Sequence, residues 1–214
     1  MPSDKPMLSA TEKQDSYRGS NARSLCDLYE SATFESVHRS WLAHLPKKPG
    51  VMLDVGTGSG RDATALQVRG WRIVAVDPSP DMLHEAQRRH PDAHIRWLRD
   101  RLPHLAGLTG ERFDFILCSA VWMHLAPTER VVGMHTIRAL LADEGICVIT
   151  LRHPPDVSRG MYEVTMSETT DLAQRHGLVV LQATQSRDPI PEWHRPDILW
   201  STIVVQRSKT WFAD

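Results

Sequence analysis

Seven short hydrophobic runs, all after residue 50, alternate with longer amphipathic segments along this 214-residue chain. Several runs are continuously apolar rather than alternating, as in strands that are covered on both faces. Strands that alternate with helices in this way form a parallel sheet with right-handed crossovers. The pattern therefore predicts an α/β fold, a three-layer αβα sandwich. The expected strands are Val51–Val55, Arg72–Val76, His94–Leu98, Phe113–Cys118, Gly145–Leu151, Leu178–Ala183 and Ile198–Gln206.

The segments between the runs carry helix start and stop signals. Arg61–Arg69 ends at Gly70, a residue that closes a helix without steric penalty. Ser79, Pro80 and Asp81 supply a cap, a first-turn proline and an acid that suits the helix dipole. Further helices are expected over Tyr17–Leu45, from Pro127, and from a capping box of Thr165 and Glu168 to near Gly177.

The length suits one domain, which we expect over residues 17–214. The polar segment Met1 to Ser16 lacks the apolar stretch of a signal peptide and is expected to be a disordered tail. The helical segment 17–45 is expected to form a lid.

A glycine-rich loop, from Asp54 to Gly60, follows the first expected strand. Ligands of open α/β sheets bind beyond the carboxyl ends of the strands, and glycines let the backbone approach them closely. The next helix points free N–H groups at the same place, which favours a carboxylate or phosphate. Gly58 to Ala63 also satisfies a loose dinucleotide-binding pattern. However, Asp54 would repel a pyrophosphate and suits an ammonium group, which argues against a dinucleotide.

Two further acids follow the next two expected strands. Asp77 can reach the ribose hydroxyls of an adenosine that lies across the strand ends, whether the ligand is NAD or S-adenosylmethionine. Asp100 can accept a hydrogen bond from an adenine amino group. The acids and the glycines therefore indicate an adenosine-containing cofactor.

With the segment Phe113–Leu125, these motifs resemble the class I S-adenosylmethionine-dependent methyltransferases, and among them the small bacterial tellurite-resistance-type group. The resemblance is specific from about Val51 to Leu151 and looser to Gln206. It implies a Rossmann-like fold, in which a seven-stranded sheet is mostly parallel and its last strand antiparallel. It also implies S-adenosylmethionine as cofactor and S-adenosylhomocysteine as product.

The resemblance implies a role for each motif. Gly56 and Gly58 would pass the methionine part of the cofactor, and Asp54 would orient the loop and the cofactor amine. Asp77 would hold the ribose. Asp100 would hold the adenine, with Leu102 flanking the ring, and Tyr29 would close over the cofactor. The complete expected set is Tyr29, Asp54, Gly56, Thr57, Gly58, Asp77, Pro78, Asp100, Arg101, Leu102 and Ser119.

Methyl transfer from a sulfonium is an in-line displacement whose main requirement is alignment, which can be worth ~7–11 kcal/mol of the barrier. A base is needed only if the nucleophile arrives protonated. His124 lies in the segment that the family places beside the methyl, where it is either a base, a substrate-positioning group or a loop-holding residue. Arg152 suits a substrate carboxylate or oxyanion, or else pairs with a surface acid. His153 is a third catalytic candidate, and Trp193 to Arg195 form either a lid wall or a hairpin tip.

Charge and composition narrow the partners. The net charge of −1, from 25 basic and 26 acidic residues, provides no basic field for nucleic acid or an anionic membrane. The motif by which amino-methylating DNA and RNA enzymes grip a base, Asn/Asp-Pro-Pro-aromatic, is absent after Phe113–Cys118. No apolar run approaches the ~18 residues of a membrane helix. The three cysteines lack metal-ligand spacing and suit a reducing cytosol.

We therefore expect a cytoplasmic methyltransferase for a small molecule, without a metal, working as a monomer or homodimer. Two alternatives remain open. One is an NAD-dependent oxidoreductase on a similar sheet, and the other is a catalytically silent cofactor-binding protein.

Overall fold

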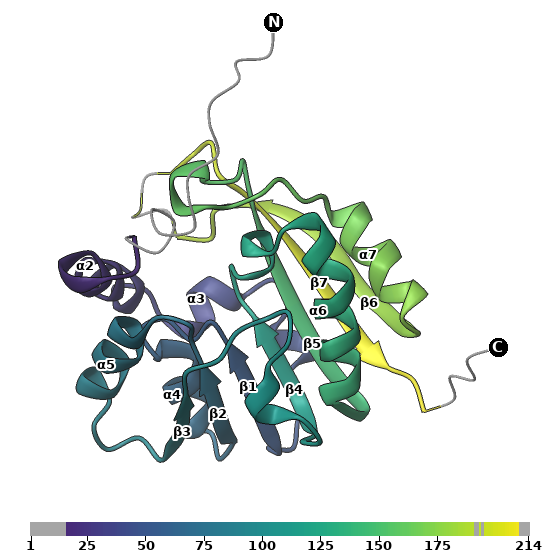
Figure 1. Cartoon of the computed structure of the whole chain (residues 1–214), viewed down its shortest axis with the longest axis horizontal. Coiled ribbons are helices and arrows are strands. Elements are labelled where there is room, and N and C mark those ends of the chain that lie inside the picture. The colour runs from purple at the N-terminus through teal and green to yellow at the C-terminus, as the bar shows by residue number, and fades with distance from the viewer. Residues whose placement is uncertain (1–15, 191–192, 194, 210–214) are drawn as a thin grey trace, which may run out of the picture.

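A single seven-stranded sheet organises the computed structural model, which describes residues 16–190, 193 and 195–209. The strand order is β3-β2-β1-β4-β5-β7-β6. The yellow β7 runs antiparallel to both of its neighbours, β5 and β6, while the other neighbouring strands are parallel (Figure 1). The strands are β1 (Val51–Val55), β2 (Arg72–Val76), β3 (Ile95–Leu98), β4 (Phe113–Cys118), β5 (Leu141–His153), β6 (Leu178–Arg187) and β7 (Leu199–Arg207).

Helices cover both faces of the sheet (Figure 1). They are α2 (Gly19–Glu30), α3 (Phe34–His38), α4 (Arg61–Gln67), α5 (Pro80–Arg89), α6 (Pro127–Leu140) and α7 (Met166–Arg175). Four 3₁₀ turns lie between them, η1 (Leu42–His44), η2 (Ala106–Leu108), η3 (Trp122–His124) and η4 (Val157–Arg159).

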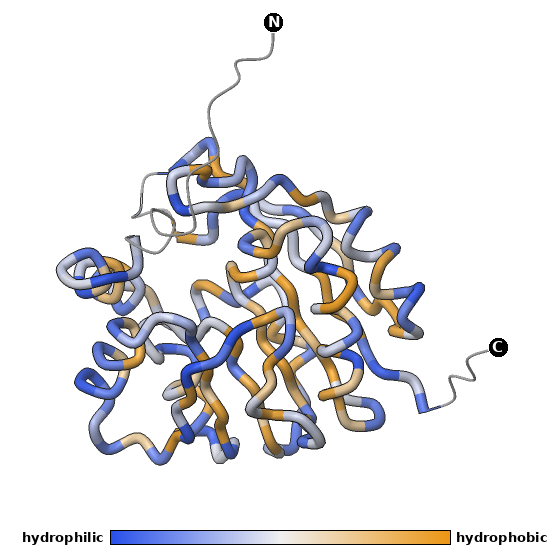
Figure 2. The backbone as a smooth tube through the Cα atoms, in the orientation of Figure 1, coloured by the Kyte–Doolittle hydropathy of each residue, from blue (hydrophilic) through white to orange (hydrophobic). Residues whose placement is uncertain are grey.

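Alternate residues of the central strands contribute to two separate hydrophobic cores. Leu53 and Val55 of β1 join Met134 in the core toward α6 and α7. Met52 joins Trp41 in the core toward α3 and α4. The hydrophobic segments, orange in Figure 2, accordingly concentrate in the central strands. The predicted three-layer sandwich and the antiparallel last strand are confirmed.

Several predicted boundaries were wrong. Tyr17–Leu45 is not one helix but α2, α3 and η1, because the Thr33 side chain accepts a hydrogen bond from the Ser36 N–H and starts a new helix. The expected capping box is half formed, since Thr165 accepts from the Glu168 N–H while the Glu168 carboxylate instead pairs with Arg130. The fifth and sixth strands extend beyond their expected ends, to His153 and Arg187.

The segment before the sheet docks on the start of α5. The Gly19 N–H donates to Asp81 at 2.7 Å, and the Ser79 hydroxyl donates to the Tyr17 carbonyl at 2.5 Å. Ser79 also caps α5, as predicted. These contacts hold the N-terminal segment beside the carboxyl end of β2. The expected tail lies almost wholly outside the described residues, which begin at residue 16.

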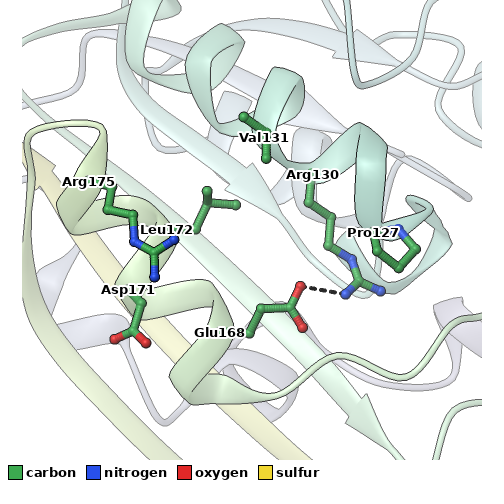
Figure 3. A pocket seen from close by; sticks show the side chains of 7 residues that line it. All are labelled: Pro127, Arg130, Val131, Glu168, Asp171, Leu172 and Arg175. Atoms are coloured by element: carbon green, nitrogen blue, oxygen red, sulfur yellow. Dashed lines mark hydrogen bonds and ion pairs between the residues drawn. The ribbon is translucent and has the colours of Figure 1, made fainter.

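A small hollow of about 290 Å³ separates α6 from α7 and contains none of the predicted site residues (Figure 3). Beside it, the buried Arg130 donates to the Leu125 and Glu163 carbonyls and pairs with Glu168 at 2.6 Å. This arginine therefore joins the two helices and the loop between them.

Candidate active site

A cavity of about 810 Å³ lies at the carboxyl ends of β1, β2, β4 and β5. All eleven residues predicted to bind the cofactor line it, and so do His124 and Arg152. His153 does not. Parallel strands end at the same edge of a sheet, so residues from successive crossovers meet there.

The glycine loop leaves little room for side chains. The Gly56 and Thr57 N–H groups donate to the Val76 carbonyl at 2.8 and 2.9 Å, which ties the loop to β2. Gly56 and Gly58 have φ of +68° and +59°, in the left-handed region that favours glycine. A Cβ on Gly56 would lie 2.4 Å from Val121, and one on Gly58 would lie 3.4 Å from the Tyr29 ring. The loop is thus a cradle whose open backbone suits a closely bound ligand.

Asp77 is buried at the end of β2. Its carboxylate accepts the Gly58 N–H at 3.1 Å and the Ser79 N–H at 2.9 Å. Burial raises its pKa to about 6, although both N–H groups oppose the shift. The carboxylate therefore both orients the loop and faces the cavity.

Asp54 is also buried, and its carboxylate accepts the Thr57 hydroxyl at 2.6 Å. Burial and the nearby Asp62 carboxylate raise the pKa of Asp54. A cationic ligand group in the cavity would offset both effects, so this position fits an ammonium group.

A polar network behind the glycine loop was not predicted. The Trp41 indole N–H donates to His38 Nδ1 at 3.2 Å, so His38 Nε2 carries the proton and donates to Asp62 at 2.8 Å. Arg61 pairs with the same carboxylate at 2.7 Å and donates to the Tyr29 carbonyl at 3.0 Å. Burial would raise the pKa of Asp62, but His38 and Arg61 hold it well below its usual range. Asp62 lies in the first turn of α4, where an acid suits the helix dipole, whereas no local sequence pattern marks His38.

The Asp100 carboxylate folds its own loop. It accepts the Arg101 N–H at 2.7 Å and the Gly107 N–H at 2.9 Å. Leu102 is buried beside it and lines the cavity, as does Pro78. The adenine-side candidates therefore gather at one end of the cavity.

His124 lies beyond the end of β4, where Ser119 also lines the cavity. The Tyr17 hydroxyl lies 3.3 Å from His124 Nε2, although the two residues are 107 positions apart. Burial raises the pKa of Tyr17, which keeps its hydroxyl protonated. The sequence contained no signal for this contact.

Arg152 and His153 are neighbours on β5 but differ in surroundings. Arg152 lines the cavity and donates to the Pro154 carbonyl at 2.6 Å. The His153 ring nitrogen Nε2 lies 3.0 Å from the Ser201 hydroxyl on β7, and burial lowers the pKa of His153. Successive strand residues point to opposite faces, which accounts for the difference.

Trp193 and Arg195 also line the cavity, while His194 lies outside the described residues. The Trp193 indole donates to the Ser31 hydroxyl at 3.0 Å, which joins this loop to the end of α2. The Arg195 guanidinium lies 4.2 Å from the centroid of the Trp193 ring.

The described residues contain neither a metal-ligand cluster nor a membrane-spanning helix. Among residues 16–190, 193 and 195–209, no cluster of three or more His, Cys, Asp or Glu side chains is placed to hold a metal ion. Within the same ranges, no helix combines the length and the apolar character needed to span a bilayer.

Comparison with known proteins shows similarity to methyltransferases. Residues 52–145 match the family model for a methyltransferase domain. An uncharacterised methyltransferase of Mycobacterium tuberculosis is 28% identical over 133 residues, which are 62% of this chain and 66% of that protein. The trans-aconitate 2-methyltransferase of Rhodopseudomonas palustris is 30% identical over 162 residues, 72% of this chain and 57% of that enzyme. The chain thus spans less than two thirds of the length of these curated relatives.

The fold of the chain also matches that of a methyltransferase crystal structure. The crystal structure of Burkholderia thailandensis 1,6-didemethyltoxoflavin-N1-methyltransferase, with 1,6-didemethyltoxoflavin and S-adenosylhomocysteine bound, has a TM-score of 0.71 at 22% identity. The match covers 97% of this chain and 94% of that one. Residues 52–145 are therefore similar to methyltransferase domains, and the chain shares the fold of a methyltransferase crystallised with S-adenosylhomocysteine, in line with the sequence prediction.

Proposed function

We propose that this protein transfers a methyl group from S-adenosylmethionine to a nucleophilic atom of a small molecule by in-line displacement. The observation that supports this most strongly is one continuous cavity that joins the glycine loop and Asp77 to His124. The sulfonium of the cofactor supplies an activated methyl group, so the protein must mainly align the nucleophile and exclude water.

The half of the cavity over β1 to β3 fits the cofactor. Gly56 and Gly58 leave room for the methionine part, and Asp54 offers a carboxylate to its ammonium group. Asp77 accepts the ribose hydroxyls while it keeps the loop in place through Gly58. Asp100 and Leu102 border the adenine. Tyr29 packs over the loop, and Arg61, held by Asp62, presents a positive charge for the methionine carboxylate.

The half beyond β4 and β5 fits the substrate. His124 serves as base or positioning group, and the Tyr17 hydroxyl holds its ring. Arg152 binds the substrate, whereas His153 supports the strand from outside the cavity. Segment 17–45 and the loop at Trp193 form a lid that excludes water.

The volume of the cavity supports a small substrate. A volume of about 810 Å³ must hold both the cofactor and the acceptor, and ligand sites are commonly of this size. The similarity to a trans-aconitate methyltransferase points the same way. Among subgroups, the spacing from Asp54 to Asp100 favours the tellurite-resistance-type group.

Thermal denaturation followed by turnover tests the proposal. A ligand that binds only the folded state raises its stability by about 2.7 kcal/mol at one hundred times its Kd. S-adenosylhomocysteine is expected to raise the melting temperature, and NADH is not. Incubation with deuteriomethyl-labelled S-adenosylmethionine and a polar metabolite extract is expected to yield a labelled product. Stabilisation by NADH alone would indicate an oxidoreductase, and binding without turnover would indicate a silent cofactor-binding protein.

A further inference from the structure

Arginine side chains line both ends of the cavity, but one end has few acids beside them. At the β1 to β3 end, where the cofactor is proposed to bind, the lining holds both acids and arginines: Asp54, Asp62, Asp77 and Asp100 with Arg61, Arg99 and Arg101. The opposite end is built from the ends of β5 and β6 and the loops after them, and its lining arginines are Arg152, Arg159, Arg187 and Arg195. Asp188 is the lining acid beside them, and Asp156 pairs with Arg159 outside the lining. Positive charges therefore outnumber negative ones at this end.

Arg195 forms an ion pair, but one of its guanidinium donors lacks a hydrogen-bond acceptor. Its Nη2 lies 2.7 Å from Asp188, and the side chain is 27% exposed. Its Nε is buried and has no hydrogen-bond partner within the part of the chain that the structure describes. Asp188 is already shared, because it also accepts the Trp200 indole N–H at 3.3 Å and the Ile190 N–H at 3.0 Å. A buried guanidinium donor without an acceptor is costly unless a ligand completes it.

Strand pairing places Arg152 at the same end of the cavity as Arg195. Arg152 lies opposite Trp200 in the β5–β7 register, and Trp200 lies opposite Ser186 in the β6–β7 register. All three line the cavity. Thr150 and Thr202, two residues along the same strands, are also paired and also line it. This floor thus combines one arginine, one tryptophan and hydroxyl groups.

Arg159 completes the group from η4. Its Nε lies 3.5 Å from Asp156, and its side chain is 29% exposed. It interacts electrostatically with Tyr17 and Tyr29 of the N-terminal segment. Burial and the charges of Arg152 and Arg159 lower the pKa of Arg195, against the effect of Asp188. Arg195 therefore lies within electrostatic range of both Arg152 and Arg159, and all three line the same cavity.

Resting on the proposed function, we infer that the methyl acceptor is a small organic acid whose carboxylate is bound by Arg152, Arg159 and Arg195. The planar guanidinium fork matches a carboxylate with two parallel hydrogen bonds. The rings of Trp193 and Trp200 contact the body of the acid, and its nucleophilic atom faces His124. The anion offsets the charges that Arg152 and Arg159 present to Arg195 and supplies the acceptor that Arg195 Nε lacks.

Fractionation of the metabolite extract tests the inference. The extract is separated on an anion-exchange resin before the intact protein and deuteriomethyl-labelled S-adenosylmethionine are added. The labelled product is expected from the retained, anionic fraction, and also after that fraction has been treated with alkaline phosphatase. A product only from the unretained fraction, or one lost after phosphatase treatment, overturns the inference and leaves the proposed function intact. A product from neither fraction overturns both.

Charge-removing variants give a second test on the active fraction. Arg152→Gln and Arg195→Gln are expected to raise the apparent KM for the acid at least about tenfold, since each removes a charge-assisted hydrogen bond. The Kd of S-adenosylhomocysteine is expected to be unchanged, and Arg195→Lys to be intermediate. Arg96→Gln is the matched control, because Arg96 pairs with Glu111 on the surface, away from the cavity. Parental KM in both glutamine variants, or an equal loss of cofactor affinity, overturns the inference.

Discussion

Protonation of Asp77 is expected to control the affinity for the adenosine part of the cofactor. The pKa of its buried carboxyl is about 6 without ligand. Ribose hydroxyls donate to the ionised form, so bound adenosine lowers this pKa, and affinity must rise with pH through about 6. At pH 5 about one tenth of the free protein is ionised, so adenosine is expected to bind about tenfold more weakly than above pH 7.

The assay is calorimetric titration of adenosine between pH 5 and pH 8. Adenosine is preferable to the whole cofactor because it lacks the ammonium group that is proposed to contact Asp54. The pKa of Asp54 is also raised, so its titration would add a second pH dependence to binding of the whole cofactor. Asp77→Asn is expected to bind adenosine weakly at every pH, with the pH dependence gone. Asp54→Asn is the control and is expected to keep the pH dependence of adenosine binding.

Asp77→Ala is a less informative variant. It removes two ribose hydrogen bonds of about 1.5–3 kcal/mol each, which corresponds to a loss of about 10²- to 10⁴-fold in affinity. It also leaves the Gly58 and Ser79 N–H groups without their acceptor, so the loop itself loosens. A wild-type affinity that is flat with pH, or an Asp77→Asn variant that keeps the slope, would refute the ribose assignment.

Three further predictions concern the loop, the catalytic end and the fold. Gly56→Ala is expected to abolish S-adenosylhomocysteine binding in calorimetry, because the new Cβ would lie 2.4 Å from Val121. Gly110→Ala is the control and is expected to keep binding, since Gly110 also has a positive φ but has open space around it. His124→Ala is expected to lower kcat by about 10²–10⁴ if the nucleophile arrives protonated, while His153→Ala keeps parental kcat; the opposite ranking would exchange their roles. Arg130→Ala is expected to lower the free energy of unfolding by about 3 kcal/mol in urea denaturation, and an unchanged midpoint would contradict its proposed role in joining α6 and α7.

The cofactor half of the site was predictable from the sequence because its parts are local. Asp54 and the glycines occupy one turn after a strand, and Asp77 ends the very next strand. Crossover handedness then brings these ends to one edge of the sheet without further information. All eleven predicted cofactor residues accordingly line one cavity. Their individual roles remain predictions.

The substrate half, and the polar network behind the glycine loop, depended on contacts that no local pattern encodes. Tyr17 meets His124, and His38 meets Asp62, only because α2 and α3 pack over the strand ends. The single helix expected over Tyr17–Leu45 is interrupted before Thr33, which caps α3, and this interruption helps to set the path of the segment over the sheet.

The alternation of strands and helices, and the motif at the first crossover, were determined by the sequence alone, since hydrophobic period and glycine geometry act over a few residues. Only the tertiary structure decided that Arg152 lines the cavity while His153 turns to Ser201, because strand phase is set by pairing with β7. The same pairing brings Arg152 and Trp200 together from distant parts of the chain. Long-range strand register thus shapes the substrate end, whereas short-range backbone chemistry shapes the cofactor end.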